Sequence, residues 1–286
     1  MIIISGQVLR PQDIANWQTE ESLVPYINEL LNSPVQFDYG SIAEMMFEVR
    51  LRRHIVEAAR ELHGSGVKFA TFAKTYGNTA YWRVTPEGAL ELKYRIPASK
   101  AIRDIIENGA FYAFECATAI VVIYYLAVLK TIGEERFNRR FRDITLYDWH
   151  YEHLPIYTET GSHFLRGDCL YFKNPDFNPA KAQWRGENVI VMGNDQYFAH
   201  GLGILTAEQI IQRLNSLRKK MPCSRLICLT RQQGLMHPRF IRSCIKTIPS
   251  SVILTMGCGM LFFSGKKPSC RALGLQPIQT SLNHVG

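Results

Sequence analysis

The segment FECATAIVVIYYLAVL, from Phe114 to Leu129, is the most informative part of the sequence. It holds one acid and one cysteine, followed by apolar side chains for several helical turns, and it has no glycine or proline. A run this long and this apolar predicts a buried helix. It is too short for a membrane span, which needs about 20 apolar residues. We therefore expect Cys116 in the first turn of a core helix.

Cys116 is the strongest candidate for a nucleophile in this chain. Unpaired backbone N–H groups and the helix dipole favour negative charge at the start of a helix. These forces stabilise the thiolate over the thiol, and the thiolate is the nucleophilic form. The alternative is that Cys116 only packs, because free cysteines are usually small buried hydrophobes.

The composition is that of a globular chain with an ample core. Its 286 residues suffice for one large domain or two small ones. The N-terminus, MIIISGQVLRPQD, has no basic leader followed by a long apolar run, so we expect no secretory signal. Seven cysteines without regular spacing then favour reduced thiols and a cytoplasmic setting.

The formal net charge of +8 is concentrated at one end of the chain. Residues 231–286 hold seven Lys or Arg and no Asp or Glu, and the rest of the chain is nearly neutral. The body therefore lacks the basic surface that binds nucleic acid. We expect a single catalytic domain over residues 1–230. We expect the atypical basic tail, 231–286, to be poorly ordered because it sustains neither helical nor strand periodicity.

The remaining patterns predict an α+β domain. Ser41 and Glu44 form a capping box before a helix that ends near Gly64, and Thr206 and Gln209 form another before a helix that ends near residues 218–220. Further helices are expected from Ser99 and over the charged piece after Gly133. Strands are expected at 68–72, on both sides of the turn 85–88, and at 144–149, 168–172, 188–192 and 196–200. This order places the cysteine helix against an antiparallel sheet.

A cysteine nucleophile needs a base or charged partner within hydrogen-bond reach. Glu187 opens one predicted strand and His200 closes the next. If these strands form a hairpin about Gly193-Asn194, the two residues lie opposite each other at its open end. Glu115, beside the cysteine, can approach the same cleft. The alternatives are a solvated strand-edge acid for Glu187, a satisfied turn histidine for His200 and a favourable helix-start acid for Glu115.

Histidines and aromatics cluster between the cysteine helix and these strands. His150, His153, His163 and Cys169 lack the paired spacing of structural zinc sites, so we expect no metal. Many aromatic side chains flank the candidate site in sequence. We expect most to be core and a few, among them Trp149, Trp184 and Tyr171, to line a narrow apolar passage.

Several long motifs resemble one known family. FYAFECATAIVVIYYLA, LYDWHYEHLPIYTETG, GDCLYFKNPDFNPAKAQWRGENVI and YFAHGLGIL are similar to the bacillus-type spore-coat protein-glutamine gamma-glutamyltransferases, which are small bacterial transglutaminases. The resemblance extends over roughly residues 1–220, and the acid-free tail departs from the family's pattern. It implies a papain-like (NlpC-type) cysteine core with Cys116 as nucleophile. It also implies Glu187 as the dyad partner, Glu115 as a possible substitute, His200 close by, and no metal or cofactor.

The resemblance also implies a reaction. Cys116 would attack a glutamine side chain and release ammonia, and a lysine amine would then take the acyl group from the thioester. The expected partners are glutamine and lysine side chains of spore coat proteins, with no nucleic acid and no membrane, inside the mother cell where the coat assembles. Two rival functions are a papain-like cysteine peptidase or amidase and a non-catalytic structural coat protein.

Overall fold

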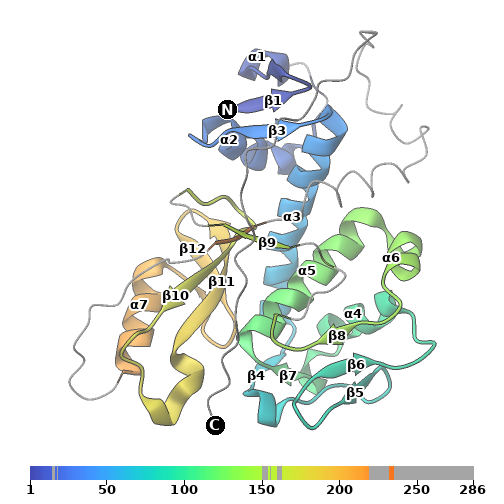
Figure 1. Cartoon of the computed structure of the whole chain (residues 1–286), viewed down its shortest axis with the longest axis vertical. Helices are drawn as coiled ribbons and strands as arrows, with labels where there is room; N and C mark the ends of the chain where they lie inside the picture. The colour runs from blue at the N-terminus through green and yellow to red at the C-terminus, as the bar shows by residue number, and fades with distance from the viewer. Residues whose placement is uncertain are drawn as a thin grey trace, which may run out of the picture.

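The chain, seen here as a computed structural model, is described over residues 1–14, 17, 19–149, 154, 156–159, 163–218 and 232–234. Its centre is a pair of helices, α3 (Ile42–Gly64) and α5 (Cys116–Ile132), which pack against each other and against a six-stranded sheet (Figure 1). A third helix, α7 (Ala207–Ser216), covers the other face of that sheet. The predicted α+β class, with the cysteine on a buried helix over an antiparallel sheet, is confirmed.

Helix α5 is buried because nearly all of its side chains are apolar. Every residue from Cys116 to Leu129 is buried, and in the last turn only Lys130 and Thr131 are not. Burying side chains of this size contributes roughly 1.5–3 kcal/mol each before entropic costs. The helix ends at Gly133, whose φ of +80° suits a glycine at a helix end. Because it is enclosed on all sides, α5 fixes the position of its first residue, Cys116.

The six-stranded sheet is antiparallel throughout and has the strand order β13-β12-β11-β10-β14-β9. Its strands are β9 (Tyr157–Glu159), β10 (Cys169–Lys173), β11 (Gly186–Gly193), β12 (Gln196–Ala199), β13 (Gly203–Leu205) and β14 (Gln232–Gly234). Alternate side chains of β10 and β11 face opposite layers. Cys169 and Ile190 join the core shared with α3 and α5, whereas Leu170 and Val189 join the cluster under α7.

Smaller elements complete the frame. One sheet has the order β2-β1-β3 and another β5-β6-β8, and a two-stranded parallel pair joins β4 to β7. Their strands are β1 (Ile2–Ile4), β2 (Gln7–Val8), β3 (Phe37–Tyr39), β4 (Lys68–Phe69), β5 (Trp82–Val84), β6 (Leu90–Leu92), β7 (Ala113–Phe114) and β8 (Thr145–Leu146). The other helices are α1 (Pro11–Ile14), α2 (Val24–Asn32), α4 (Ala98–Glu107) and α6 (Glu134–Arg140), with short 3-10 turns at Glu21–Leu23, Phe72–Lys74, Gly109–Phe111 and Pro179–Trp184.

One of the two predicted capping boxes is complete and the other is half formed. Thr206 and Gln209 form the complete capping box of α7. At α3 the Ser41 hydroxyl accepts from the Glu44 N–H, but the Glu44 carboxylate accepts instead from the Gly40 N–H. The predicted strands at 68–72 and 144–149 shrink to two residues each, in β4 and β8, because each pairs over only two residues.

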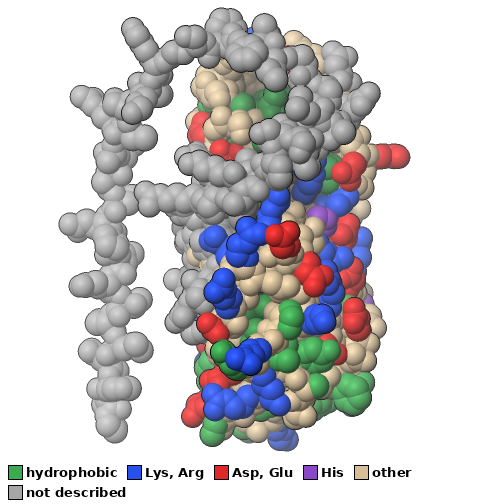
Figure 2. Space-filling model, turned by 90° about the vertical axis from the view of Figure 1, so that its right-hand side faces the viewer, with side chains coloured by type: hydrophobic (Ala, Val, Ile, Leu, Met, Phe, Trp, Pro, Cys, Tyr) green, Lys and Arg blue, Asp and Glu red, His purple; other side chains and the backbone are tan. Residues whose placement is uncertain are grey.

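Of the predicted basic tail, the described part is β14, which pairs with β10 and β9. The rest of residues 231–286 lies outside the described residues, so the domain boundary at 230 and the poor order of the tail stay predictions. Among the described helices, none has the length and apolar content needed to cross a membrane. Lys and Arg side chains lie interspersed with Asp and Glu on the face that Figure 2 shows.

Candidate active site

Cys116 is the first residue of α5, immediately after the two-residue strand β7. Its side chain is buried, with 3% of the residue exposed. Because β7 is tied to β4 and α5 is enclosed by the core, the sulfur is held on a rigid junction rather than on a loop. A nucleophile in such a place keeps one geometry through the reaction.

Glu115 is the N-cap of α5 and contacts the nucleophile directly. The Cys116 thiol donates to Glu115 Oε1 at 3.1 Å, and the Ala117 N–H donates to Glu115 Oε2 at 2.8 Å. The cap therefore orients the carboxylate that receives the thiol hydrogen. It also occupies the Ala117 N–H, one of the backbone donors that the helix start offers for an oxyanion.

Asn188 is the second direct partner of the sulfur, and the sequence did not single it out. Its side-chain amide Nδ2 donates to Cys116 Sγ at 3.4 Å, and only 8% of the residue is exposed. The correct pairing of β11 with β12 would have identified Asn188 as the residue across from His200. Val189 pairs with Ala199, so the next pair sets Asn188 across from His200.

The predicted pairing of Glu187 with His200 across the hairpin is therefore wrong by one residue. The hairpin closes around Asn194-Asp195, one residue later than predicted, because Gly193 pairs with Gln196; the extra β11 residue between Val191 and Gly193, which has no partner on β12, offsets only part of the resulting shift. A shift of one residue turns a side chain to the other face of a sheet.

Glu187 is nevertheless close enough to act on Cys116 electrostatically. It is fully buried, and neither carboxylate oxygen has a hydrogen-bond partner among the described residues. Burial, reinforced by the charge of Glu115, raises the pKa of Glu187 well above its usual value. Burial therefore favours the protonated, neutral form of this carboxyl group.

The Cys116 thiol also holds its proton. Burial raises the pKa of Cys116 well above its usual value, and the charges of Glu187 and Glu115 and the hydrogen bond to Glu115 act in the same direction. The Asn188 amide opposes them. The expectation of a thiolate stabilised by the helix start is thus wrong for the resting site, since desolvation and two acids outweigh the dipole.

His200 lies against the junction that carries Cys116, and it contacts Phe114 of β7 rather than the sulfur. Its Nε2–H donates to the Phe114 carbonyl at 3.2 Å, and its ring stacks on the Phe114 ring with centroids 5.4 Å apart. Burial lowers the pKa of His200 to about 4, against the opposing effect of the backbone of Lys68 and Phe114. A neutral histidine here positions β7 rather than transferring protons.

A cavity of about 330 Å³ opens beside Cys116. Its wall includes two of the three residues expected in the passage, Trp149 and Tyr171, together with Phe72. The third, Trp184, is absent from the described lining and stacks on Phe69 with centroids 5.4 Å apart. Further lining residues are Glu115, Cys116, Ala117, Asp148, Cys169, Leu170, Gln183, Arg185, Gly186 and Asn188.

Two of the histidines considered for a metal, His150 and His153, lie outside the described residues. His163 is exposed, whereas Cys169 is buried in β10, where desolvation raises the pKa of its thiol. Within the described ranges there is no cluster of three or more His, Cys, Asp or Glu side chains arranged to hold a metal ion.

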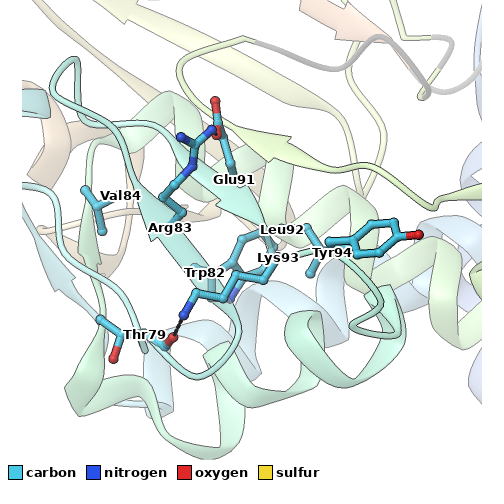
Figure 3. A pocket seen from close by; sticks show the side chains of 8 residues that line it. All are labelled: Thr79, Trp82, Arg83, Val84, Glu91, Leu92, Lys93 and Tyr94. Atoms are coloured by element: carbon cyan, nitrogen blue, oxygen red, sulfur yellow. Dashed lines mark hydrogen bonds and ion pairs between the residues drawn. The ribbon is translucent and has the colours of Figure 1, made fainter.

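A larger hollow lies on the hairpin of β5 and β6, but it holds no nucleophile (Figure 3). Its charged groups are already paired: Arg83 with Glu91, and the Lys93 ammonium with the Thr79 carbonyl. The chemistry of the described residues is therefore concentrated at the smaller cavity beside Cys116.

Comparisons with known proteins find one family. A family model described as protein-glutamine gamma-glutamyltransferase matches residues 1–236. The protein-glutamine gamma-glutamyltransferase of Bacillus subtilis is 67% identical over 242 residues, which cover 85% of this chain and 99% of that protein. The one from Bacillus licheniformis is 61% identical over 219 residues, 77% of this chain and 89% of that protein. A solved structure of a transglutaminase from Geobacillus stearothermophilus, without its C-terminal extension, superposes with a TM-score of 0.68 at 42% identity, covering 71% of this chain and 97% of that one.

Proposed function

The chain belongs to the protein-glutamine gamma-glutamyltransferase family and is an acyltransferase, and from this premise we propose that it forms ε-(γ-glutamyl)lysine bonds through a thioester on Cys116. The observation that carries the proposal is the Cys116 sulfur itself. It is bracketed by an acceptor, Glu115 Oε1 at 3.1 Å, and a donor, Asn188 Nδ2 at 3.4 Å, at the wall of a cavity. A nucleophile, an oriented base and a neutral dipole are the parts that covalent acyl transfer requires.

In the first half-reaction the thiol proton passes to Glu115 as the sulfur attacks the glutamine carboxamide. The C–S bond forms, the C–N bond breaks, and the departing nitrogen needs one proton to leave as ammonia. Glu187 can supply it, because burial raises the pKa of that carboxyl group and so favours its protonated form. Transfer of a proton from Glu115 to Glu187, which interact electrostatically, then restores the resting state.

This division of roles refines the expectation from the resemblance, in which Glu187 is the base. The Gln side chain enters through the cavity lined by Phe72, Trp149 and Tyr171. Aromatic walls exclude water, which competes with the amine for the thioester, so they favour transfer over hydrolysis. His200 contributes by holding the Phe114 carbonyl, two residues before the nucleophile.

Glutamine and lysine side chains of spore coat proteins are the proposed substrates, and the mother cell, where the coat assembles, is the proposed location. The family resemblance of the motifs around Cys116 and Glu187 supports this assignment. Cross-linking of isolated coat proteins by the purified protein into species resistant to boiling in detergent and reductant tests it. Failure to cross-link coat proteins while cross-linking other glutamine-rich proteins would contradict the choice of substrate alone.

The reaction itself is tested by following two products from one incubation. We expect the wild type to incorporate a fluorescent primary amine into a glutamine-rich protein and to release ammonia in step. Cys116→Ala, with thermal unfolding showing that it is folded, should do neither. Ammonia release without amine incorporation would instead support a hydrolase, and silence in both assays from folded wild-type protein would support a structural role.

A further inference from the structure

Two carboxylates line the cavity beside Cys116, and the thioester chemistry uses only one of them. The Glu115 carboxylate accepts hydrogen bonds from the Cys116 thiol and the Ala117 N–H. The second is Asp148, which follows β8 and reaches the same cavity from another wall. Its carboxylate accepts the backbone N–H of Trp149 and forms no ion pair with a described basic side chain. A charge at the wall of a reaction cavity, with no part in forming the thioester, calls for another role.

Asp148 is held in a fixed position relative to the nucleophile. Its N–H donates to Thr118 Oγ1 at 3.0 Å, and Thr118 lies in α5, two residues after Cys116. Its backbone has a φ of +46°, in the left-handed region that non-glycine residues seldom adopt. Aspartate adopts this region more readily than most non-glycine residues, and the Thr118 hydrogen bond holds the backbone in place.

The charge on Asp148 is poorly screened. The residue is half-buried, and desolvation raises the pKa of its carboxyl group, while the positive charge of Arg185 opposes that rise. Arg185 lines the same cavity at the start of β11. A second cation that enters the cavity would therefore meet attraction from Asp148 and repulsion from Arg185.

We propose that Asp148 binds the ammonium group of the acceptor lysine and thereby selects cationic amines. The inference rests on the proposed transferase function and deepens it. A lysine side chain, with a pKa of about 10.4, arrives protonated, and a carboxylate inside a low-dielectric cavity attracts it more strongly than one in water.

The proton balance of this step is complete. The ammonium gives one proton to Asp148, which passes it to solvent. The neutral nitrogen attacks the thioester carbonyl, so the N–C bond forms and the C–S bond breaks. The second proton of the nitrogen goes to the sulfur, and the Cys116 thiol is regenerated.

The test compares two acceptors at a saturating concentration of one glutamine peptide. Cadaverine is a cation at pH 8, and hydroxylamine is uncharged. We expect Asp148→Asn to lower the ratio of kcat/KM for cadaverine to kcat/KM for hydroxylamine about tenfold. Asparagine tolerates the left-handed backbone as aspartate does, so the variant removes the charge and keeps the shape. Asp143→Asn, at an exposed position five residues earlier, is the matched control and should keep the wild-type ratio.

A second variant should change the ratio of the two kcat/KM values in the opposite direction. Arg185→Gln removes the competing cation and should raise the same ratio severalfold. If Asp148→Asn does not fold, the salt dependence of the wild type is measured instead. Added NaCl should lower kcat/KM for cadaverine and leave kcat/KM for hydroxylamine unchanged. Equal ratios in wild type and Asp148→Asn, or equal salt dependence for both acceptors, would overturn the role of Asp148 alone. A wild type that uses neither acceptor would overturn the proposed function and this inference together.

Discussion

The side-chain amide of Asn188 lies 3.4 Å from the sulfur of Cys116 and is the one described partner that favours the thiolate. All the other influences on the thiol act the opposite way: burial, the charge of Glu187, and the charge and hydrogen bond of Glu115. The site thus keeps its nucleophile protonated at rest and relies on a neutral dipole to make ionisation accessible. Asn188 lies on β11 between β10 and β12 with 8% of the residue exposed, so the sheet fixes its amide beside the sulfur at the cavity wall.

Replacing Asn188 should therefore make the thiol harder to ionise. A hydrogen bond to a charged group contributes about 1.5–3 kcal/mol, so Asn188→Ala should raise the pKa of Cys116 by about one unit or more. The measurement is the rate of Cys116 alkylation by iodoacetamide as a function of pH. The rise of this rate with pH should shift to higher pH. Asn188→Asp, which adds a charge, should move it further. Superimposable pH–rate curves for wild type and Asn188→Ala would contradict the assignment.

The two glutamates should respond differently to the same change. Glu115→Gln removes the negative charge, the base and one of the two acceptor oxygens, so Cys116 alkylation at neutral pH should become faster while ammonia release falls about 10²–10⁴-fold. Glu187→Gln removes a group whose charged form burial disfavours, so alkylation at neutral pH should rise less than it does in Glu115→Gln. Ammonia release should still fall, because the amide has no proton to give.

The comparison needs both readouts on each variant. A Glu115→Gln protein that is slow in alkylation as well as in ammonia release would mean that Glu115 does not hold the thiol hydrogen. A Glu187→Gln protein with unimpaired ammonia release would exclude Glu187 as the proton donor.

The sequence could predict the features that are determined by neighbouring residues, but not those that depend on residues far apart in the chain. The burial of α5 and the place of Cys116 at its start follow from the composition of one stretch, 114–129, and were predicted. The partner of the sulfur on β11 was not, because the hairpin closes around Asn194-Asp195 rather than Gly193-Asn194 and an unpaired residue between Val191 and Gly193 offsets only part of that shift. The raised pKa of Cys116 was missed for a related reason. It depends on Glu187, 71 residues away in the chain, and on burial that only the assembled core creates.

A third prediction concerns the close approach of Tyr171 to the start of β11. A Cβ atom added at Gly186 would lie 2.1 Å from the Tyr171 hydroxyl and 2.7 Å from the Phe172 carbonyl oxygen. Gly186→Ala must therefore push Tyr171 away from its place on the cavity wall, at a cost of about 1–3 kcal/mol for overpacking. We expect a lower midpoint of unfolding and reduced amine incorporation.

The matched control for this prediction is Gly64→Ala, since a Cβ at Gly64 would meet nothing within 4 Å. That variant should keep the wild-type midpoint and activity. If Gly186→Ala behaved in the same way, Tyr171 would not be fixed by contact with β11.

The last prediction follows from the buried, neutral His200. Its pKa in the folded protein is about 4, below the ordinary value of 6.5. Between these two values the unfolded chain binds more protons than the folded one, so the stabilisation is present above about pH 6.5 and is lost as the pH falls toward 4. The shift corresponds to about 3 kcal/mol.

His200→Gln can still donate to the Phe114 carbonyl but does not titrate. Between pH 7 and pH 4 its free energy of unfolding in urea should therefore fall by about 3 kcal/mol less than that of the wild type. His63→Gln, at an exposed position, is the control. An equal pH dependence in wild type and His200→Gln would mean that the His200 ring is not neutral in the folded protein, and the role of His200 as a neutral positioning residue would fail with it.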